Sequence, residues 1–283
     1  MIRGLLFVGY LLIRFLAGDV RLGCWKVSGA APRPGTARRP GRPTDRPGGE
    51  PHRERRLRAA VSLYMLREGR RLVRRAGDLT GFSLVTESAL PDLPQRFVLV
   101  SNHQSLLDIP VLIAALPGRT LKFVAKRSLK YGVPLVSKCL RYGGDALIVR
   151  PRGRIDTAQI RALVRELRRF AALADEGSCP VIFADGSRSR DGAVHQFHSG
   201  GLAIVLEGRQ LPIVTAALDG GYRLRGLAGL ARMGTTRYRV KFLSVYQPPE
   251  NKAELRKMVQ RAQTEIAAQI ERWRRPSSVL TPG

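Results

Sequence analysis

The chain has 283 residues, with 49 Lys and Arg against 22 Asp and Glu, which gives a formal net charge of +27. Apolar residues make up 44% of it, enough to fold around a core, so a wholly disordered, collagen-like or coiled-coil protein is excluded. The positive charge indicates an anionic partner, whether nucleic acid, a phospholipid surface or a phosphorylated substrate. Cys24, Cys139 and Cys179 are scattered without a CxxC pair, so we expect neither a disulfide framework nor a metal site.

Residues 1–20 are predicted to associate with a membrane. The apolar run at residues 4–18, GLLFVGYLLIRFLAG, is shorter than a bilayer-spanning helix and contains Arg14. No convincing small-residue cleavage site of a signal peptide follows it. We therefore expect a segment that lies in the lipid interface, with Arg14 extending towards the headgroups. A poorly ordered apolar terminus is the alternative.

The next two segments are strongly basic. Residues 28–57 are rich in Pro, Gly and Arg and poor in large apolar side chains, which predicts a disordered linker. Residues 58–80 predict a basic amphipathic helix, because apolar residues recur at helical spacing beside a cluster of arginines. Such a helix fits either a membrane interface with anionic lipids or the surface of the domain that follows it.

Residues 81–275 alternate between strand and helix patterns. Apolar or alternating runs predict strands at residues 97–101, 122–125, 146–149, 181–184, 213–218 and 238–245. Helical periodicity predicts helices at residues 105–115, 157–174 and 251–275, the last of them with Asn251 and Glu254 as a capping pair. Strands separated by helices indicate a single α/β domain with a mixed, mainly parallel sheet flanked by helices.

His103 and Asp108 are the first candidate site. The histidine follows the predicted strand at residues 97–101, and the carboxyl end of a strand is where open α/β sheets place their sites. A carboxylate five residues later can bond one imidazole nitrogen, which fixes the tautomer and stabilises the cation formed when the other nitrogen takes a proton. The pair therefore suits a general base acting on a hydroxyl. A helix-capping aspartate beside a loop histidine would give the same pattern.

A second candidate site follows the predicted strand at residues 181–184. Asp185, Gly186, Ser187 and Arg188 form a turn in which the glycine lets the backbone approach a ligand closely. Arg188 can direct two donors at a phosphate, and the Ser187 hydroxyl can add a third. A polar turn with solvated arginines is the alternative.

Together the two blocks resemble the lysophosphatidic acid acyltransferase family of glycerolipid acyltransferases. Residues 102–108 match its NHxSxxD motif at every defining position, and residues 183–189, FADGSRS, resemble its FPEGTRS motif with three departures, at Ala184, Asp185 and Ser187. Between them, Lys126 ends a stretch that resembles the family's FVAK, and Arg150 ends the stretch GDALIVR, which resembles a further motif. Residues 197–201 and 211–214, which follow the FADGSRS stretch, resemble the family as well. The resemblance therefore spans residues 97–218.

The resemblance implies acyl transfer from an acyl-CoA or acyl carrier protein thioester to the free hydroxyl of lysophosphatidic acid, which forms phosphatidic acid. It implies that His103 is the general base, that Asp108 orients it, and that Arg150 and Arg188 hold the acceptor phosphate. The substrate-binding candidates are Lys126, Arg150, Asp185, Gly186, Ser187 and Arg188. The acyl carrier is a co-substrate, and no cofactor is implied. The implied partners are a phospholipid membrane, on its cytoplasmic face, and the two substrates, without specific nucleic acid.

Three alternatives stay open. The acceptor could be another lysolipid, or a related hydroxyl or amine compound, because Asp185 is one methylene shorter than the family's usual glutamate. A non-enzymatic nucleic-acid or membrane binder fits the charge, but aromatic residues are only 6% of the chain and no nucleic-acid-binding motif is visible. A catalytically weakened homologue fits the departure at Asp185 but not the presence of His103 and Asp108.

Overall fold

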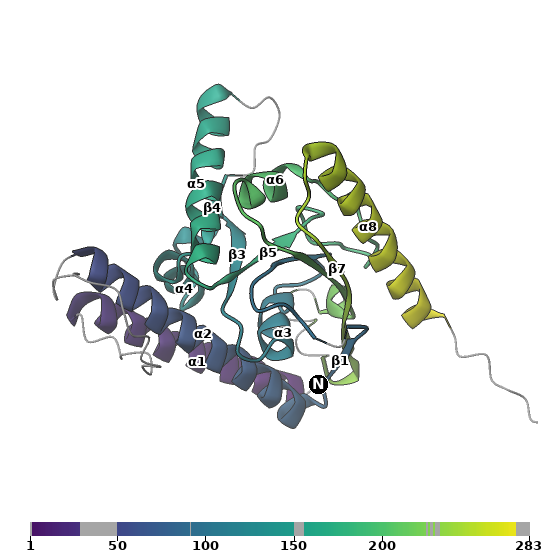
Figure 1. Ribbon diagram of the computed structural model, residues 1–283. Helices are drawn as coiled ribbons and strands as arrows, with labels where there is room; N and C mark the ends of the chain where they lie inside the picture. Colours follow the sequence, from purple (N-terminus) through teal and green to yellow (C-terminus); the bar gives the residue numbers. More distant parts are fainter. Residues whose placement is uncertain are drawn as a thin grey trace, which may run out of the picture.

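The computed structural model describes residues 2–28, 50–90, 92–149, 156–224, 226, 229 and 233–275. Its strands are β1 (Ser83–Ser88), β2 (Val98–Ser101), β3 (Leu121–Lys126), β4 (Ala146–Ile148), β5 (Cys179–Phe183), β6 (Ile213–Asp219) and β7 (Arg237–Tyr246). Its α-helices are α1 (Ile2–Ser28), α2 (Glu50–Thr80), α3 (Asp108–Ala115), α4 (Val136–Gly143), α5 (Thr157–Asp175), α6 (Gly200–Leu206) and α8 (Lys252–Arg274) (Figure 1).

The strands form one mixed sheet in the order β1-β7-β6-β2-β5-β3-β4. Strands β6, β2, β5, β3 and β4 run parallel to one another, whereas β7 is antiparallel to β6 and pairs in parallel with β1. The prediction of a mixed, mainly parallel sheet is therefore confirmed. Because parallel strands end at the same edge of a sheet, the loops that follow β2, β3, β5 and β6 meet at one edge.

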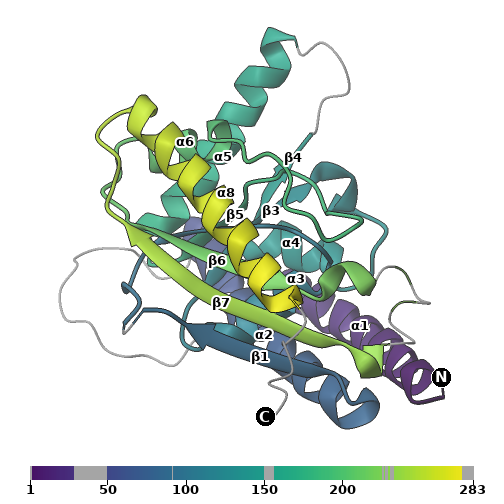
Figure 2. The ribbon, with the colours of Figure 1, turned by 90° about the vertical axis from the view of Figure 1, so that its right-hand side faces the viewer.

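Helices cover both faces of the sheet. In β2, Leu99 belongs to the core that includes residues of α2 and α3, whereas Val98 and Val100 belong to the core under α5, α6 and α8. Successive side chains of a strand point to opposite faces, so a strand buried on both faces is apolar at every position. Figure 2 shows α8 lying across β6 and β7, which it contacts.

The helices α1 and α2 lie side by side and antiparallel (Figure 1). Arg14 in α1 forms an ion pair with Glu68 in α2 at 2.5 Å, and the rings of Trp25 and Tyr64 meet edge to face. The predicted extension of Arg14 towards lipid headgroups is therefore wrong. The helix predicted at residues 58–80 is confirmed, and it packs on the domain through contacts with α3 and α4.

The linker predicted at residues 28–57 is wrong at both ends. Ser28 is the last residue of α1, and residues 50–57 form the first turns of α2, where Leu57 is buried beside Leu22. Composition misled here because Arg and Glu are good helix formers, and a helix with one packed face needs few apolar residues. Residues 29–49 of the predicted linker lie outside the described residues.

The predicted strands are confirmed to within two residues at each end. The helix predicted at residues 105–115 begins only at Asp108, and the closing helix α8 is capped as predicted by Asn251, whose side chain accepts from the amides of Ala253 and Glu254. Three elements have no counterpart in the prediction: β1, α4 and α6. Each is short, and β1 is a half-exposed edge strand, so its apolar alternation is weak.

Candidate active site

The candidate residues gather where the parallel strands end. His103 lies two residues after β2, Asp185 lies two residues after β5, Lys126 is the last residue of β3, and Asp219 is the last residue of β6. Strand β2 pairs with both β5 and β6, and Ser101 is in register with Phe183 and Ala216. The sheet thus brings together His103 and Asp185, which are 82 positions apart in the chain.

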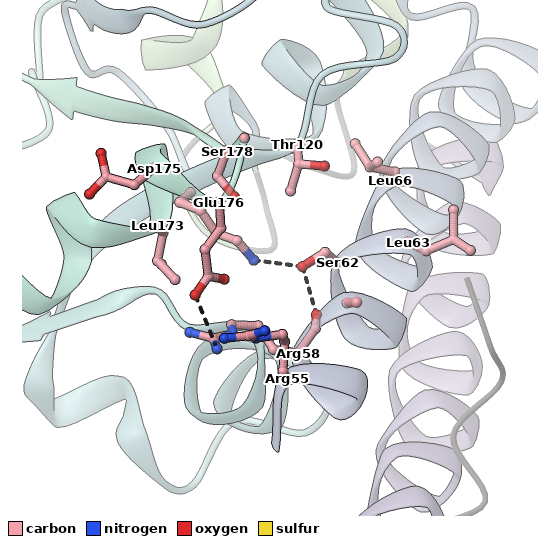
Figure 3. A pocket seen from close by; sticks show the side chains of 13 residues that line it. Arg55, Arg58, Ser62, Leu63, Leu66, Thr120, Leu173, Asp175, Glu176 and Ser178 are labelled. Carbon is pink, nitrogen blue, oxygen red and sulfur yellow. Dashed lines mark hydrogen bonds and ion pairs between the residues drawn. The ribbon is translucent and has the colours of Figure 1, made fainter. Parts of the chain in front are cut away.

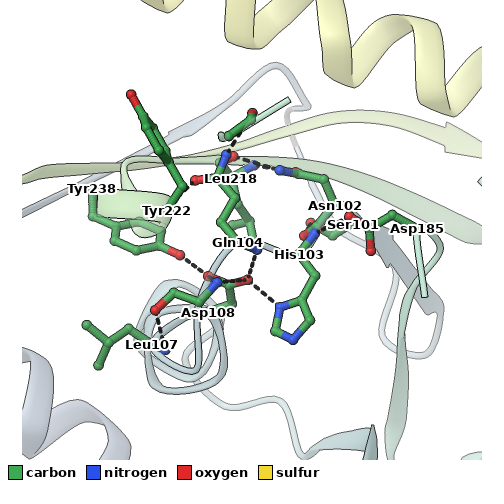
Figure 4. A network of polar contacts seen from close by, with 12 residues as sticks. Ser101, Asn102, His103, Gln104, Leu107, Asp108, Asp185, Leu218, Tyr222 and Tyr238 are labelled. Atoms are coloured by element: carbon green, nitrogen blue, oxygen red, sulfur yellow. Dashed lines mark hydrogen bonds and ion pairs between the residues drawn. The ribbon is translucent and has the colours of Figure 1, made fainter. Parts of the chain in front are cut away.

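His103 and Asp108 form a hydrogen-bonded pair (Figure 4). The imidazole Nδ1 lies 2.6 Å from Asp108 Oδ2, and the aspartate side chain is fully buried while the histidine side chain is 12% exposed. A buried carboxylate at this distance fixes the tautomer with hydrogen on Nδ1. Nε2 then carries the lone pair, and no residue in the described part of the chain hydrogen-bonds to it. The arrangement can therefore accept a proton at Nε2.

Backbone amides hold Asp108 in place. Its Oδ2 accepts from the amide of Gln104 at 2.7 Å, and both of its oxygens lie 3.1 Å from the amide nitrogen of Ser105. These donors come from the turn that precedes α3, which explains why the helix starts at Asp108 instead of Ser105. The first turn of a helix also favours a negative charge. Together these features give the fully buried side chain of Asp108 several hydrogen-bond donors.

The loops after β2 and β5 are joined through His103. Its ring stacks on Phe183 with centroids 4.0 Å apart and an angle of 11° between the planes. Its amide donates to Asp185 Oδ2 at 2.8 Å, and its carbonyl accepts from the amide of Ser189 at 2.8 Å. The position of His103 is therefore fixed by the Phe183 ring and by hydrogen bonds of its backbone amide and carbonyl.

Asp185 is buried with one oxygen unsatisfied. The residue is 6% exposed, and its Oδ1 is a buried oxygen without a hydrogen-bond partner among the described residues. Burial raises the pKa of the Asp185 carboxyl to about 6, against the opposing effects of the His103 amide and the His103 charge. An unsatisfied buried acceptor beside a catalytic candidate fits a donor supplied by a ligand.

The remaining predicted residues fall into three groups. Gly186 has φ +65, a left-handed conformation that favours glycine, and turns the chain so that Ser187 and Arg188 are exposed at the edge of the sheet. Lys126 is also exposed at the end of β3, but no contact joins it to the other candidates within the described residues. Arg150 lies outside the described residues.

The structure adds a polar network next to His103 that the sequence patterns do not indicate. Gln104 Nε2 lies 3.3 Å from Asp219 Oδ1, and Asp219 forms an ion pair with Arg274 of α8 at 2.5 Å. On the other side, the Tyr238 hydroxyl donates to Asp108 Oδ1. Gln104 lies within the NHxSxxD motif, and this position in the sequence could have indicated that it belongs to the site. Asp219, Tyr238 and Arg274 belong to an ordinary strand end, an alternating strand and an amphipathic helix, and carry no signal of their own.

A separate cavity of about 680 Å³ lies at the opposite edge of the sheet, beside the first residues of β3 and β5 (Figure 3). Two pairs of its polar groups bond one another: Arg58 lies 3.6 Å from Glu176, and Lys122 Nζ donates to Ser62 Oγ at 2.6 Å. Burial lowers the pKa of Lys122. These charged groups of the cavity thus have partners, whereas Asp185 presents an unpartnered buried oxygen at the carboxyl edge.

Comparisons with known proteins agree with this geometry. Residues 85–219 match the family model described as Acyltransferase. A chloroplastic 1-acyl-sn-glycerol-3-phosphate acyltransferase, BAT2 of Brassica napus, is 31% identical over 152 residues, 52% of this chain and 40% of its own. The chloroplastic enzyme LPAT1 of Arabidopsis thaliana is 28% identical over 151 residues, 52% of this chain and 39% of its own. The matched region thus spans about two fifths of these curated relatives.

A solved structure shares the fold over almost the whole chain. It is the crystal structure of the 1-acyl-sn-glycerophosphate acyltransferase PlsC from Thermotoga maritima, with a TM-score of 0.63 over 98% of this chain and 97% of that one. The two chains are 21% identical, so this likeness establishes the fold alone. It includes the antiparallel helices α1 and α2, which lie outside the region that matches the family model.

Proposed function

Because residues 85–219 match the Acyltransferase family model, we propose that the chain transfers an acyl group from a thioester to the free hydroxyl of lysophosphatidic acid. The donor is acyl-CoA or acyl carrier protein, and the product is phosphatidic acid. The observation that carries the proposal is the 2.6 Å bond between His103 Nδ1 and the fully buried Asp108, which leaves Nε2 as the proton acceptor. The names of the curated relatives support the choice of acceptor.

In the proposed reaction, His103 Nε2 removes the proton from the acceptor hydroxyl as its oxygen attacks the thioester carbonyl carbon. The carbon–sulfur bond then breaks, and the proton passes from His103 to the leaving thiolate. Asp108 stabilises the imidazolium in the interval. The hydroxyl attacks directly, so the reaction uses no acyl-enzyme and no nucleophilic side chain. A thioester leaves readily, so the proposal includes no cofactor or metal beyond the acyl carrier.

The loop after β5 is proposed to bind the acceptor. Ser187 and Arg188 are exposed in this loop, whose residue Asp185 bonds the His103 amide, and a guanidinium can form two parallel hydrogen bonds to a phosphate. Lys126, the last residue of β3, and Arg150 are proposed to add positive charge. Asp185 is proposed to accept a hydrogen bond from the glycerol part of the acceptor through its unsatisfied Oδ1.

We propose further that α1 places the enzyme on a phospholipid membrane, at its cytoplasmic face. Apolar side chains that are 58% to 83% exposed lie along one face of α1, opposite the buried Phe7 and Leu22: Leu6, Leu12, Ile13, Leu16, Val20 and Val27. No helix in the described residues is long and apolar enough to cross a membrane. An exposed apolar face on a basic protein suits the interface of an anionic bilayer.

Vesicle flotation tests the role of α1. A double variant, Ile13→Ser with Leu16→Ser, should lose most of its binding to vesicles that contain phosphatidylglycerol, while Ile160→Ser, an exposed apolar residue of α5, should bind as the wild type does. Equal binding by all three proteins would contradict the proposal. Substitution is preferable to truncation, because residues of both α1 and α2 are buried in the cores.

The proposed reaction is tested with the full chain, labelled acyl-CoA or acyl carrier protein, and lysophosphatidic acid. We expect labelled phosphatidic acid from the wild type and a loss of at least roughly 100-fold in kcat for His103→Ala. His198→Ala, a nearby exposed histidine, is the matched control and should keep its activity. Transfer to another lysolipid at a higher rate would correct the acceptor. Transfer that persists in His103→Ala would refute the general base.

A further inference from the structure

Tyr238 contacts Asp108, the partner of the proposed general base, from the interior of the protein. It stands on β7, its side chain is fully buried, and its hydroxyl donates to Asp108 Oδ1 (Figure 4). The two residues are 130 positions apart in the chain, and Tyr238 lies outside the region that matches the family model. The contact therefore depends on the pairing of β7 with β6 and β1, which places Tyr238 beside the loop after β2.

Each oxygen of Asp108 has its own set of donors. Oδ2 receives His103 Nδ1 at 2.6 Å and the amide of Gln104 at 2.7 Å. Oδ1 receives the Tyr238 hydroxyl, and its other donor, the Ser105 amide at 3.1 Å, is shared with Oδ2. Tyr238 is thus the one side-chain partner of Oδ1 among the described residues. Without Tyr238, the Oδ1 atom of this fully buried carboxylate would have a single donor, the Ser105 amide that it shares with Oδ2.

The surroundings of Tyr238 keep its hydroxyl in this position as a donor. Burial, followed by the charge of Asp108, raises the pKa of the Tyr238 hydroxyl well above its ordinary value, so the phenol keeps its proton. Its ring packs against Phe82 with centroids 6.1 Å apart. A Cβ on Gly221 would lie 2.6 Å from the Tyr238 oxygen and 3.1 Å from Asp108 Oδ1, so the glycine leaves the space that this bond occupies.

We propose that Tyr238 is a positioning residue for the acyl transfer: its hydroxyl fixes the Asp108 carboxylate so that Oδ2 stays directed at His103 Nδ1. The inference rests on the proposed function. The physical reason is that a carboxylate can rotate about its terminal torsion, and donors on both oxygens restrict that rotation. Tyr238 acts through Asp108 and touches no substrate. Its removal should therefore slow proton transfer without weakening the binding of either substrate.

The test compares Tyr238→Phe with Tyr246→Phe. Both tyrosines stand on β7 and both donate to a carboxylate, but Tyr246 bonds Glu265 of α8 at 2.8 Å, away from His103. We expect Tyr238→Phe to lower kcat by roughly 10- to 100-fold, the effect of losing a hydrogen bond to a charged group, with both KM values within twofold of the wild type. Tyr246→Phe should leave kcat within twofold. Equal effects of the two variants on kcat would overturn the proposal.

A double variant shows whether Tyr238 acts through Asp108. In the Asp108→Asn background, adding Tyr238→Phe should change kcat by less than threefold, because the carboxylate it positions is gone. A full additional loss of 10-fold or more would show that Tyr238 acts by another route, and would overturn the proposal.

A substrate-free measurement separates this inference from the proposed reaction. The proton on His103 Nδ1, bonded to a buried carboxylate, should give a downfield proton resonance, assigned by its loss in His103→Ala. Tyr238→Phe should shift this resonance, and Tyr246→Phe should not. If the shift occurs but the wild type transfers no acyl group, the proposed function fails and the positioning role stands. If the resonance is unchanged by Tyr238→Phe, the positioning role fails whatever the reaction is.

Discussion

The two loops that meet at His103 differ in how completely their polar groups are satisfied. In the loop after β2, Asp108 receives backbone and side-chain donors on both oxygens, and the Asn102 side chain bonds the amide and the carbonyl of Leu218 at 2.9 Å each. In the loop after β5, Asp185 leaves one buried oxygen unpartnered and Arg188 is exposed. One loop is complete without a ligand, and the other has groups that a ligand would satisfy.

This difference suggests a division of roles between the loops. A general base needs its position fixed before the substrate arrives, because a small displacement of the reacting groups slows the reaction greatly. A binding loop must instead keep donors and acceptors open for the substrate. We therefore expect substitutions in the first loop to affect kcat, and substitutions in the second to affect the KM of the acceptor. The following predictions test this contrast, from the largest expected effect to the smallest.

Asp108→Asn should produce the largest loss among these substitutions. The amide lacks the charge that stabilises the imidazolium, and its NH₂ group can select the wrong histidine tautomer. We expect kcat to fall by roughly 10²- to 10⁴-fold in steady-state assays, with the acceptor KM nearly unchanged. Asp191→Asn, an exposed aspartate of the second loop, is the control and should retain at least a third of the activity. A kcat of Asp108→Asn within tenfold of the wild type would rule out the proposed role.

Arg188→Ala should act on the acceptor. Losing a charge-assisted contact with a phosphate should raise the acceptor KM by roughly 10- to 100-fold and leave the donor KM within twofold. Arg190→Ala removes the same charge from an exposed position two residues further on and should have a much smaller effect. If Arg188→Ala raises both KM values equally, the guanidinium does not distinguish the acceptor from the donor.

Asp185→Asn should stabilise the fold above pH 6. The folded protein binds the Asp185 proton with a pKa of about 6, above the ordinary value of 3.8, so wild-type stability falls as pH rises between these values and the loss is complete above about 6. Asparagine has no such ionisation, so the variant should exceed the wild type by roughly 2 kcal/mol at pH 7.5 and by little near pH 4. Urea denaturation at both pH values measures this difference.

The control for Asp185→Asn is Asp191→Asn. The amide of Ala193, followed by the Ser189 hydroxyl, lowers the pKa of Asp191, so removing its charge should not stabilise the fold at pH 7.5. A stabilisation of both variants, or of neither, would show that the unsatisfied buried oxygen of Asp185 is not the cause. Lower acceptor use by the more stable Asp185→Asn would agree with a binding role for that oxygen.

Gly186→Ala should have the smallest effect on activity. Gly186 and Gly118 both have positive φ values, +65 and +83, and an added Cβ would meet only His198 at 3.9 Å in the first case and nothing within 4 Å in the second. Each alanine should therefore lower the free energy of unfolding by about 1 kcal/mol through backbone strain alone. Only Gly186→Ala should also raise the acceptor KM, by severalfold, because it lies in the loop proposed to bind the acceptor. An equal acceptor KM in Gly186→Ala and Gly118→Ala would show that Gly186 has no role in acceptor binding.

Much of this arrangement can be predicted from the sequence. The resemblance carried by residues 102–108 and 183–189 agrees with the match of residues 85–219 to the Acyltransferase family model, and the predicted strands place both motifs at strand ends. These predictions succeed because buried strands are marked by local apolar runs, and because His103 and Asp108 are only five residues apart in the chain. Local information was sufficient in both cases.

The long-range contacts could not be predicted in the same way. Tyr238 reaches Asp108 only because β7 turns back antiparallel to β6, and no periodicity in residues 238–245 reports that pairing. The sequence predicts that Arg14 extends towards lipid headgroups, but its partner Glu68 lies 54 residues away on another helix. The departure at Asp185 is visible in the sequence, whereas its unsatisfied oxygen depends on the amide of His103 and on burial.

The division of roles between the two loops is tested most directly by acceptor binding without the acyl donor. Titration calorimetry with a water-soluble, short-chain lysophosphatidic acid would compare the wild type, His103→Ala and Arg188→Ala. We predict that His103→Ala binds the acceptor within threefold of the wild type, while Arg188→Ala binds it at least roughly tenfold more weakly. Weaker binding by His103→Ala with unchanged binding by Arg188→Ala would contradict the account.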